Sequence, residues 1–497
     1  MSKYIISIDQ GTTSSRVCLF NKNGQLVDQV QKEFRQIFPK PDWVEHDAEE
    51  IWQTVVYCLK EILTKYSAVD IDSVGITNQR ETVVLWDKQT GKPVHNAIVW
   101  QDKRTDKVCS KLRKVNGNYV KKATGLVIDP YFSGTKIRWM LDNVLETKSL
   151  LKEKRLLAGT IDTFLIWKLT KGAVHATDVS NASRTLLMNL KTRDWDAKCL
   201  KIFGVPVEIL PEVKKSNSLF GTIECAEVKN LLTKNINING VAGDQQAALF
   251  GQVCFEKGMS KCTFGTGSFI LYNIGNQIKY SNSGLLTTLA WELEGEKPFY
   301  AFEGGAFVCG AAVGWLRDNL GLMKESKDIE TMAAQVDSTE GVIFVSALAG
   351  LGAPYWKDGA KGRIVGLTRK SNKFHLARAT LESMSLQNLD IIKVMEKESG
   401  KKLLELKTDG GAAKNNLLMQ FQSDFLQKKV LRAQVVETTA LGAAFLSGLG
   451  SGFWKSKSEL KSTWKWDKEF LPKKKSKFLT ETIRNWDRAV RNLIEEL

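Results

Sequence analysis

Three short segments of the chain combine glycine with Thr, Ser or Asn in a pattern that suits phosphate binding. They are 9–16, with the sequence DQGTTSSR, 261–272, which contains a GTG turn, and 406–416, which contains a Gly-Gly pair. Backbone N–H groups can approach phosphate oxygens closely where no Cβ intervenes, and adjacent hydroxyls add further donors. The third segment also leads into a predicted helix, whose free N–H groups favour anions. Each could be an ordinary turn, but together they favour a site for ATP.

Asp244 and the pair Arg80-Glu81 lie where strands are predicted to end, and their side chains could transfer a phosphoryl group to an alcohol. Asp244 follows the apolar run 238–243 and precedes an Ala-rich helix start. Its carboxylate could accept the proton of an attacking hydroxyl, or it could merely cap the helix. Arg80 and Glu81 follow the strand-like run 73–77 and offer donors and acceptors to the adjacent hydroxyls of a polyol. The alternative for this pair is a solvent-exposed ion pair.

Other common kinds of catalytic centre are not expected. The chain has four histidines, and none accompanies a Ser or Cys nucleophile motif. Its eight cysteines are scattered without a CxxC pair, so we predict buried, reduced thiols and no metal cluster. A required cation would therefore be Mg2+, carried in with the nucleotide and held through carboxylates and water.

The elements that must hold these residues alternate between strand and helix, which is typical of an α/β protein. The segments around 4–20 and 261–272 share one plan, an apolar strand, a turn containing Gly-Thr and a second strand. This plan predicts two related halves, 1–250 and 251–497, although two unrelated hairpins could also coincide. Strands are predicted at 4–8, 16–20, 73–77 and 342–345, and helices at 48–65, 376–394 and 417–425.

The composition is that of a folded, soluble protein. Of the 497 residues, 43% are hydrophobic and 25% charged, which excludes disordered, collagen-like and coiled-coil classes. The net charge of +16 is spread thinly, so nucleic acid is not an expected partner. Neither a signal peptide nor a membrane span is expected, which favours the cytoplasm. Near the end of the chain, apolar residues at helical spacing predict a helix packed on the second half; they are Ile483, Trp486, Val490 and Leu493. The basic run 473–477 is expected to form an exposed turn.

The chain resembles the glycerol kinases of the FGGY sugar-kinase family, which share the fold of actin, hexokinase and the heat-shock ATPases. The resemblance extends from the N-terminus to about residue 454. It implies two similar ribonuclease-H-like domains with a cleft between them. The matching stretches are 9–16, 77–82, 97–102, 128–136, 181–185, 243–252, 350–356, 409–411 and 439–444.

The resemblance implies the reaction of ATP and glycerol to ADP and sn-glycerol 3-phosphate with Mg2+. The half 1–250 would bind glycerol and phosphate, and the half 251–497 would bind the nucleotide. Asp244 would be the general base, and Asp9 and Asp244 would position the metal ion. The hydroxyls would bind Arg80, Glu81, Tyr131, Asp244 and Gln245, with Trp100 and Phe269 against the carbon chain. The nucleotide would meet Thr12, Thr13, Ser14, Arg16, Thr266, Gly310, Gly411 and Asn415.

Two other functions stay open at this point. One is a related kinase that acts on a ketopentose or another polyol, although the set Arg80, Trp100 and Tyr131 suits a three-carbon triol. The other is a binding or assembly protein of the actin and chaperone type, in which ATP drives a conformational switch. The expected partners are glycerol and ATP, and the expected assembly is a homodimer.

Overall fold

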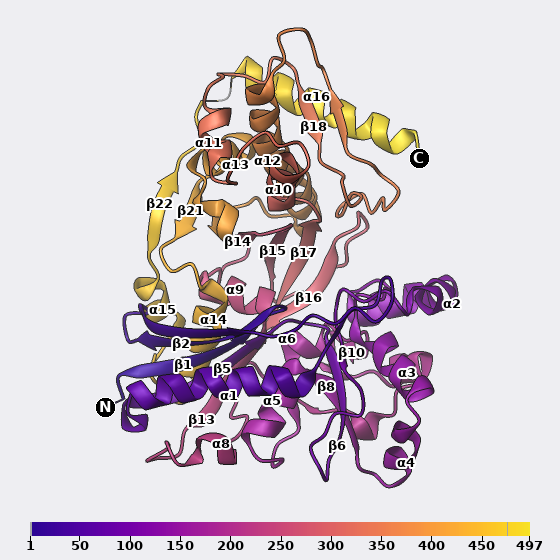
Figure 1. Cartoon of the computed structure of the whole chain (residues 1–497), viewed down its shortest axis with the longest axis vertical. Helices are drawn as coiled ribbons and strands as arrows, with labels where there is room; N and C mark the ends of the chain where they lie inside the picture. Colours follow the sequence, from indigo (N-terminus) through magenta and orange to yellow (C-terminus); the bar gives the residue numbers. More distant parts are fainter. Residues whose placement is uncertain (1, 475) are drawn as a thin grey trace.

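The computed structural model describes residues 2–474 and 476–497. It consists of two lobes, one above the other in Figure 1, each with a mixed sheet at its centre. The first sheet has the strand order β13 (Asn237–Gly243), β5 (Ile71–Asn78), β1 (Tyr4–Gln10), β2 (Ser14–Asn21) and β3 (Leu26–Glu33). The second has the order β16 (Leu286–Trp291), β17 (Phe299–Ala306), β15 (Ser268–Gly275), β14 (Ser260–Phe264), β20 (Leu406–Asp409), β21 (Val430–Ala433) and β22 (Trp466–Phe470).

The two sheets repeat one topology. In the first, β1 pairs antiparallel with β2 and β2 with β3, while β5 and β13 run parallel to β1. In the second, β14, β15 and β17 form the same antiparallel series, and β20 and β21 continue it in parallel. The hairpins 4–21 and 260–275 therefore occupy equivalent positions, and their likeness in sequence is not a coincidence. The predicted α/β fold of two ribonuclease-H-like units is confirmed.

Smaller sheets extend the first lobe and carry part of the site. One has the order β4 (Glu45–His46), β7 (Ala97–Ile98), β6 (Val83–Asp87) and β8 (Leu156–Thr160). The two-stranded sheets of this lobe pair β9 (Ala176–Asp178) with β12 (Glu212–Lys214) and β10 (Met188–Asn189) with β11 (Asp194–Trp195). A further pair, β18 (Ile343–Val345) with β19 (Arg363–Val365), lies in the second lobe, near α12 and α16.

Helices cover these sheets. The residues up to Gly251 supply α1 (Ala48–Lys65), α2 (Asp106–Thr124), α3 (Ser133–Asn143), α4 (Glu146–Lys152), α5 (Ile161–Leu169), α6 (Val179–Ala182), α7 (Ala197–Phe203), α8 (Ala226–Lys229) and α9 (Asp244–Gly251). The rest supply α10 (Gly310–Asp318), α11 (Asp328–Ala333), α12 (Lys373–Ser399), α13 (Asn416–Leu426), α14 (Thr438–Ser451), α15 (Lys457–Thr463) and α16 (Lys477–Glu495).

Helix α14 belongs to the second half of the chain but covers the first sheet. It lies against β1, β5, β13 and α9, and Figure 1 shows it among the strands of the lower lobe. The hydrophobic cluster around it draws side chains from both halves, among them Ile5, Phe250, Trp291 and Leu446. A cut of the chain at residue 250 would therefore remove a helix from the sheet that it covers.

Glycine lets α14 and α9 cross closely. A Cβ at Gly442 would lie 1.8 Å from the carbonyl oxygen of Ala247, so a larger side chain requires the two helices to separate. We expect Gly442→Ala to destabilise the protein by about 1–3 kcal/mol, in the range of overpacked cores. Gly117 is a matched control because its Cβ would meet only Arg113 Cγ at 3.6 Å within α2. There the same change should stabilise the helix by about 0.5–1 kcal/mol. Urea unfolding of both variants measures the difference, and equal effects would contradict the packing argument.

The other local predictions are also confirmed. Helix α1 has the predicted bounds, and the predicted helices 376–394 and 417–425 lie within α12 and α13. All eight cysteines are free and buried. Trp486, Val490 and Leu493 of α16 pack into the core of the second half. Lys473, Lys474 and Lys477 are exposed, as expected for the basic run, whereas residue 475 lies outside the described residues.

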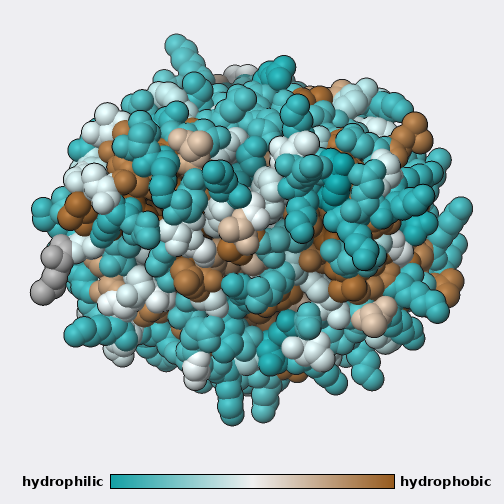
Figure 2. Space-filling model, turned by 90° about the horizontal axis from the view of Figure 1, so that it is seen from below, coloured by the Kyte–Doolittle hydropathy of each residue, from teal (hydrophilic) through white to brown (hydrophobic). Residues whose placement is uncertain are grey.

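Among the described residues, no helix is both long enough and apolar enough to cross a bilayer. The face seen in Figure 2 carries mostly hydrophilic side chains, and its apolar side chains lie in small separate patches. Scattered apolar residues of this kind are normal on globular proteins.

Candidate active site

Three parallel strands of the first sheet end side by side, and their ends gather the predicted site. The register pairs Gln10 of β1 with Asn78 of β5, and Asn78 with Gly243 of β13. The phosphate-type turn, the Arg80-Glu81 pair and Asp244 therefore leave the sheet at one edge, where ligands bind in open α/β sheets. Asp244 is the first residue of α9, and the N-cap is Gly243, so the prediction of a mere cap does not describe it.

The Arg80-Glu81 pair is buried and forms part of a network, so the alternative of an exposed ion pair is wrong. Arg80 and Glu81 are only 3% and 1% exposed. Arg80 Nη1 and Nη2 donate to the two carboxylate oxygens of Glu303 at 2.6 and 3.0 Å, and Arg80 Nε lies 3.2 Å from Asp244 Oδ1. Arg184 joins Glu81 at 2.6 Å and Glu303 at 2.9 Å. Two arginines and three carboxylates thus hold one another in fixed geometry.

Glu303 is the carboxylate that pairs with both arginines. Burial raises its pKa, but the charges of Arg184 and Arg80 outweigh burial and lower the pKa to about 2. Glu303 lies on β17 of the second sheet, whereas both arginines come from the first half of the chain. The network therefore joins the two lobes at the floor of the cleft.

The backbone of Glu81 is held in an unusual conformation. Its φ angle is +61°, in the left-handed region that side chains other than glycine rarely adopt. Ser133 Oγ donates to the carbonyl oxygen of Glu81 at 3.1 Å, and Arg184 holds its carboxylate. Strain of this kind persists where the surroundings fix it and is common at functional sites.

A cavity of about 560 Å³ opens beside this network and is lined by both lobes. Trp100 and Tyr131 come from the first half, and Phe269 and Glu303 come from the second. The rings of Trp100 and Tyr131 meet edge to face at 5.5 Å, and Trp100 Nε1 donates to Thr12 Oγ1 at 3.0 Å. The cavity therefore combines an aromatic wall with charged groups, as expected for a small molecule that is apolar along its chain and rich in hydroxyls.

The turns of the second sheet lie together. Gly310 N donates to Gly265 O at 2.9 Å, so the GTG turn packs against the start of α10. A Cβ at Gly410, which has φ +88°, would lie 2.5 Å from Phe264 O, so the Gly-Gly turn packs against the same strand end. Gly411 is exposed with open space around it, and Asn415 caps α13 by accepting from Leu418 N at 2.8 Å. A second cavity of about 260 Å³ lies beside this turn.

Arg16, a predicted phosphate contact, already has partners within the protein. Its guanidinium pairs with Glu437, which precedes α14, and donates to Gln31 Oε1 at 3.1 and 2.9 Å. A phosphate at Arg16 would therefore compete with Glu437. Next to Glu437, Thr438 donates to the buried carboxylate of Asp409. Of the other predicted phosphate contacts, Thr13 is exposed and Ser14 Oγ accepts from Gln31 at 2.9 Å.

Asp9 and Asp244 offer oxygen ligands for a cation. Burial raises the pKa of Asp9 to about 6; Arg16 opposes this shift, whereas the negative charge of nearby Asp244 adds to it. Carboxylate oxygens suit a hard divalent cation, and Mg2+ often binds through one or two carboxylates with water and substrate phosphates. Within residues 2–474 and 476–497, no cluster of three or more His, Cys, Asp or Glu side chains suits a metal.

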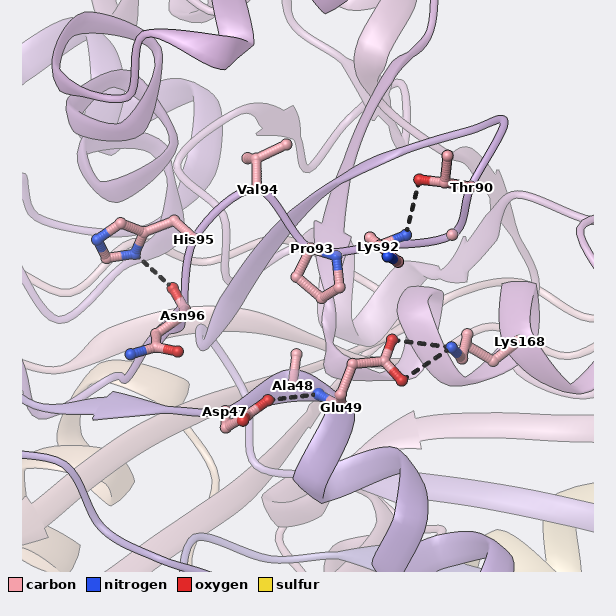
Figure 3. A pocket seen from close by; sticks show the side chains of 11 residues that line it. Asp47, Ala48, Glu49, Thr90, Lys92, Pro93, Val94, His95, Asn96 and Lys168 are labelled. Atoms are coloured by element: carbon pink, nitrogen blue, oxygen red, sulfur yellow. Dashed lines mark hydrogen bonds and ion pairs between the residues drawn. The ribbon is translucent and has the colours of Figure 1, made fainter.

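A further pocket lies elsewhere in the first lobe and contains none of the predicted site residues (Figure 3). Three of its charged groups already have partners: Lys168 donates to Glu49 at 2.8 and 3.1 Å, and Asp47 caps α1. His95 Nδ1 lies 2.8 Å from Asn96 O. The pocket therefore offers a ligand few unpaired groups.

Sequence reasoning assigned no role to three residues of the site. Arg184 and Glu303 complete the buried network, and Lys261 donates to Gln245 and to Thr263. A signal was present, because Glu303 and Lys261 are the single charged residues in otherwise uncharged strand sequences, FYAFEGGA and SKCTF. A buried charge in a strand interior needs a partner, but sequence alone does not say which.

Comparison with known proteins agrees with this geometry. The model of the N-terminal domain of the FGGY family of carbohydrate kinases matches residues 4–251, and that of the C-terminal domain matches residues 260–450. The crystal structure of Plasmodium falciparum glycerol kinase with ADP superposes with a TM-score of 0.94 at 38% identity, covering 99% of this chain and 98% of that one. Xylulose kinase from Lactobacillus acidophilus, at 24% identity and a TM-score of 0.89, shows the same fold.

Curated relatives match over nearly their full length. Glycerol kinase of Bdellovibrio bacteriovorus is 55% identical over 493 residues, which is 99% of each chain. Glycerol kinase of Fusobacterium nucleatum subsp. nucleatum is 52% identical over 98% of each chain. Together with the two domain matches and the site between the lobes, these similarities show that the chain is an enzyme that belongs to the FGGY family of carbohydrate kinases.

Proposed function

We propose that this chain phosphorylates glycerol with ATP and releases ADP and sn-glycerol 3-phosphate. The observation that carries the proposal is the contact of Arg80 with Asp244, Glu303 and Tyr131 beside an aromatic-lined cavity between the lobes. Glycerol kinases at 50–55% identity over the full chain support the same substrate.

In this mechanism, glycerol lies in the cavity with its hydroxyls bonded to protein groups and its carbons against aromatic rings. The hydroxyl partners are Arg80, Glu81, Tyr131, Asp244 and Gln245, and the rings are those of Trp100 and Phe269. Asp244 accepts the proton of the terminal hydroxyl while that oxygen forms a bond to the γ-phosphorus of ATP. The bond from phosphorus to the bridging oxygen breaks, and ADP leaves with that oxygen. Catalysis then rests on positioning and charge stabilisation.

The nucleotide is assigned to the glycine-rich turns that face the cleft. Thr12, Thr13, Ser14 and Arg16 are its proposed phosphate contacts in the first half. Thr266, Gly310, Gly411 and Asn415 are the proposed contacts in the second half. Asp9 and Asp244 would hold Mg2+, which when bound neutralises phosphate charge. In this assignment, 1–250 binds glycerol and phosphate, and 251–497 binds the nucleotide.

The test is a spectrophotometric assay of ADP formation with ATP, Mg2+ and a panel of glycerol, xylulose, ribulose and gluconate. Glycerol should give the highest kcat/KM. A higher kcat/KM for xylulose or another sugar would instead identify the related sugar kinase, and slow ATP hydrolysis insensitive to every polyol would favour the ATP-driven binding protein. A thermal shift by glycerol alone gives an independent readout, because a ligand that binds the native state raises Tm.

Homodimer formation rests on the family resemblance, and a cytoplasmic location rests on the free, buried cysteines; both are part of the proposal. The chain has a mass of 55.7 kDa, so light scattering distinguishes one copy from two. A mass near that of one chain at assay concentration would contradict the dimer.

A further inference from the structure

Lys261 is a buried lysine beside the proposed glycerol site and has no assigned role. It lies on β14 and is 0% exposed. Its ammonium donates to Gln245 Oε1 and to Thr263 Oγ1, the latter at 2.9 Å. Neither of these partners carries a charge, and burial lowers the pKa of Lys261 although Asp409 and Asp244 oppose that shift. Keeping an ammonium group in such a place costs stability, which suggests a functional reason for it.

The contact with Lys261 occupies the oxygen of the Gln245 amide and leaves its NH2 group as the end that could bind a ligand. An amide has one acceptor oxygen and one NH2 donor group, whereas an ammonium can only donate. With Oε1 held by Lys261, the Nε2 donor of Gln245 must point away from β14. Gln245 is half-buried at the start of α9, directly after Asp244, whose carboxylate can only accept when ionised. The beginning of α9 therefore presents one acceptor and one donor side by side.

We propose that Lys261 is a positioning residue that holds the Gln245 amide as a hydrogen-bond donor to a glycerol hydroxyl. This inference rests on the proposed function. Because Lys261 comes from the second lobe and Gln245 from the first, the donor is aligned only while the two lobes are together. The donor then complements the acceptor Asp244, and a substrate needs adjacent hydroxyls to satisfy both. Lys261 acts through Gln245 and does not itself contact glycerol.

The first test replaces Lys261 with methionine, which keeps the length of the side chain and removes its donors. We expect the KM for glycerol to rise about tenfold, the size of one lost hydrogen bond, with kcat and the KM for ATP within about threefold. We expect Tm to stay the same or rise, because a buried cation is replaced by an apolar group. An unchanged KM for glycerol, with or without a fall in Tm, would overturn the inference.

Lys407→Met is the matched control. Lys407 is a buried lysine on β20, next to β14, with 4% side-chain exposure, and it donates to Gln252 O at 2.8 Å. Its loss should leave the KM for glycerol unchanged. A rise equal to that of the Lys261 variant would show a general effect of removing buried lysines and would contradict the assigned role.

A double-mutant cycle separates action through Gln245 from direct contact. In a Gln245→Ala background, the change Lys261→Met should add no further rise in KM, whereas a full additional tenfold rise would overturn the inference. Gln245→Glu provides a second variant that retains a partner for Lys261 but replaces the donor with an acceptor. It should also raise the KM for glycerol about tenfold, and an unchanged KM would count against the donor role.

The proposed function is tested separately, because glycerol-dependent ADP formation by the unaltered chain is measured first. If that activity is absent, the proposed function fails and the variants are not needed. If it is present and Lys261→Met leaves the KM for glycerol unchanged, only the positioning role fails.

Discussion

Replacing Asp244 with asparagine is expected to lower kcat for glycerol phosphorylation by about 10²–10⁴, the usual contribution of a general base. Asparagine has nearly the same shape but cannot accept a proton from the attacking hydroxyl. The KM for glycerol should change much less, because Tyr131 still lines the cavity and stays in contact with Arg80, which pairs with Glu81. Steady-state kinetics with varied glycerol at saturating ATP separate the two parameters.

Asp106→Asn is the control for Asp244→Asn. Asp106 is exposed and lines the cavity beside the buried network, so the change also removes one negative charge near the site. We expect kcat of the Asp106 variant to stay within about twofold, because removing an exposed charge costs little. Near-normal kcat in the Asp244 variant, or an equal loss in both variants, would remove Asp244 from the chemical step.

Replacing Glu303 with glutamine is expected to be the most destabilising change in the site. The carboxylate of Glu303 accepts from Arg80 at 2.6 and 3.0 Å and from Arg184 at 2.9 Å. A neutral amide leaves two buried guanidinium groups without this counter-charge, which typically costs about 3–5 kcal/mol. The kcat/KM for glycerol should also fall by at least tenfold, because Arg80 loses the partner that orients it. Urea unfolding and steady-state kinetics measure the two effects.

The stability effect of Glu303→Gln should depend on pH in a defined direction. The pKa of Glu303 is lowered from 4.5 to about 2 in the folded protein, so its ionised form is favoured by folding. Its contribution to the free energy of unfolding is complete above pH 4.5 and is lost as pH falls through 2. The difference between the unaltered protein and the variant should therefore be constant above about pH 5 and shrink below it. A constant difference across the whole range would contradict this assignment.

Glu50→Gln provides the comparison for an exposed ion pair. Glu50 pairs with Arg35 at 3.0 Å, and the Arg35 side chain is 75% exposed. Loss of this pair should cost less than about 1 kcal/mol, since solvent and side-chain entropy offset exposed pairs. Equal losses of unfolding free energy in the Glu303 and Glu50 variants would show that burial of the network adds nothing to stability.

Much of the fold could be predicted from sequence because its signals are local. Apolar runs that alternate along the chain with helix-type segments predicted the strands, and helix α1 was predicted with its observed bounds. The repeated hairpin predicted two related halves because both copies begin equivalent sheets. Residue types and positions suggested roles for Arg80 and Asp244, and the resemblance to the glycerol kinases favoured these roles over the alternatives. The structure places Arg80 Nε 3.2 Å from Asp244 Oδ1.

The rest depends on contacts between distant parts of the chain. Glu303 meets Arg80 across 223 positions, and no local pattern relates the two. The packing of α14 on the first sheet could not be predicted from local sequence either. A helix sequence indicates which face of the helix is apolar, but it does not indicate which sheet that face covers. The Arg16 and Glu437 pair also joins distant segments, and it shows that a proposed phosphate ligand can have a protein partner of its own.

A crystal structure of the protein with glycerol and a non-hydrolysable ATP analogue tests the central claim most directly. The account predicts glycerol in the cavity between Trp100 and Phe269, with its terminal hydroxyl about 2.6–3.2 Å from the Asp244 carboxylate. The γ-phosphorus should lie on the far side of that hydroxyl, between the turns that contain Thr12 and Thr266. Glycerol bound away from Asp244, or a γ-phosphate turned away from the glycerol hydroxyl, would contradict the account.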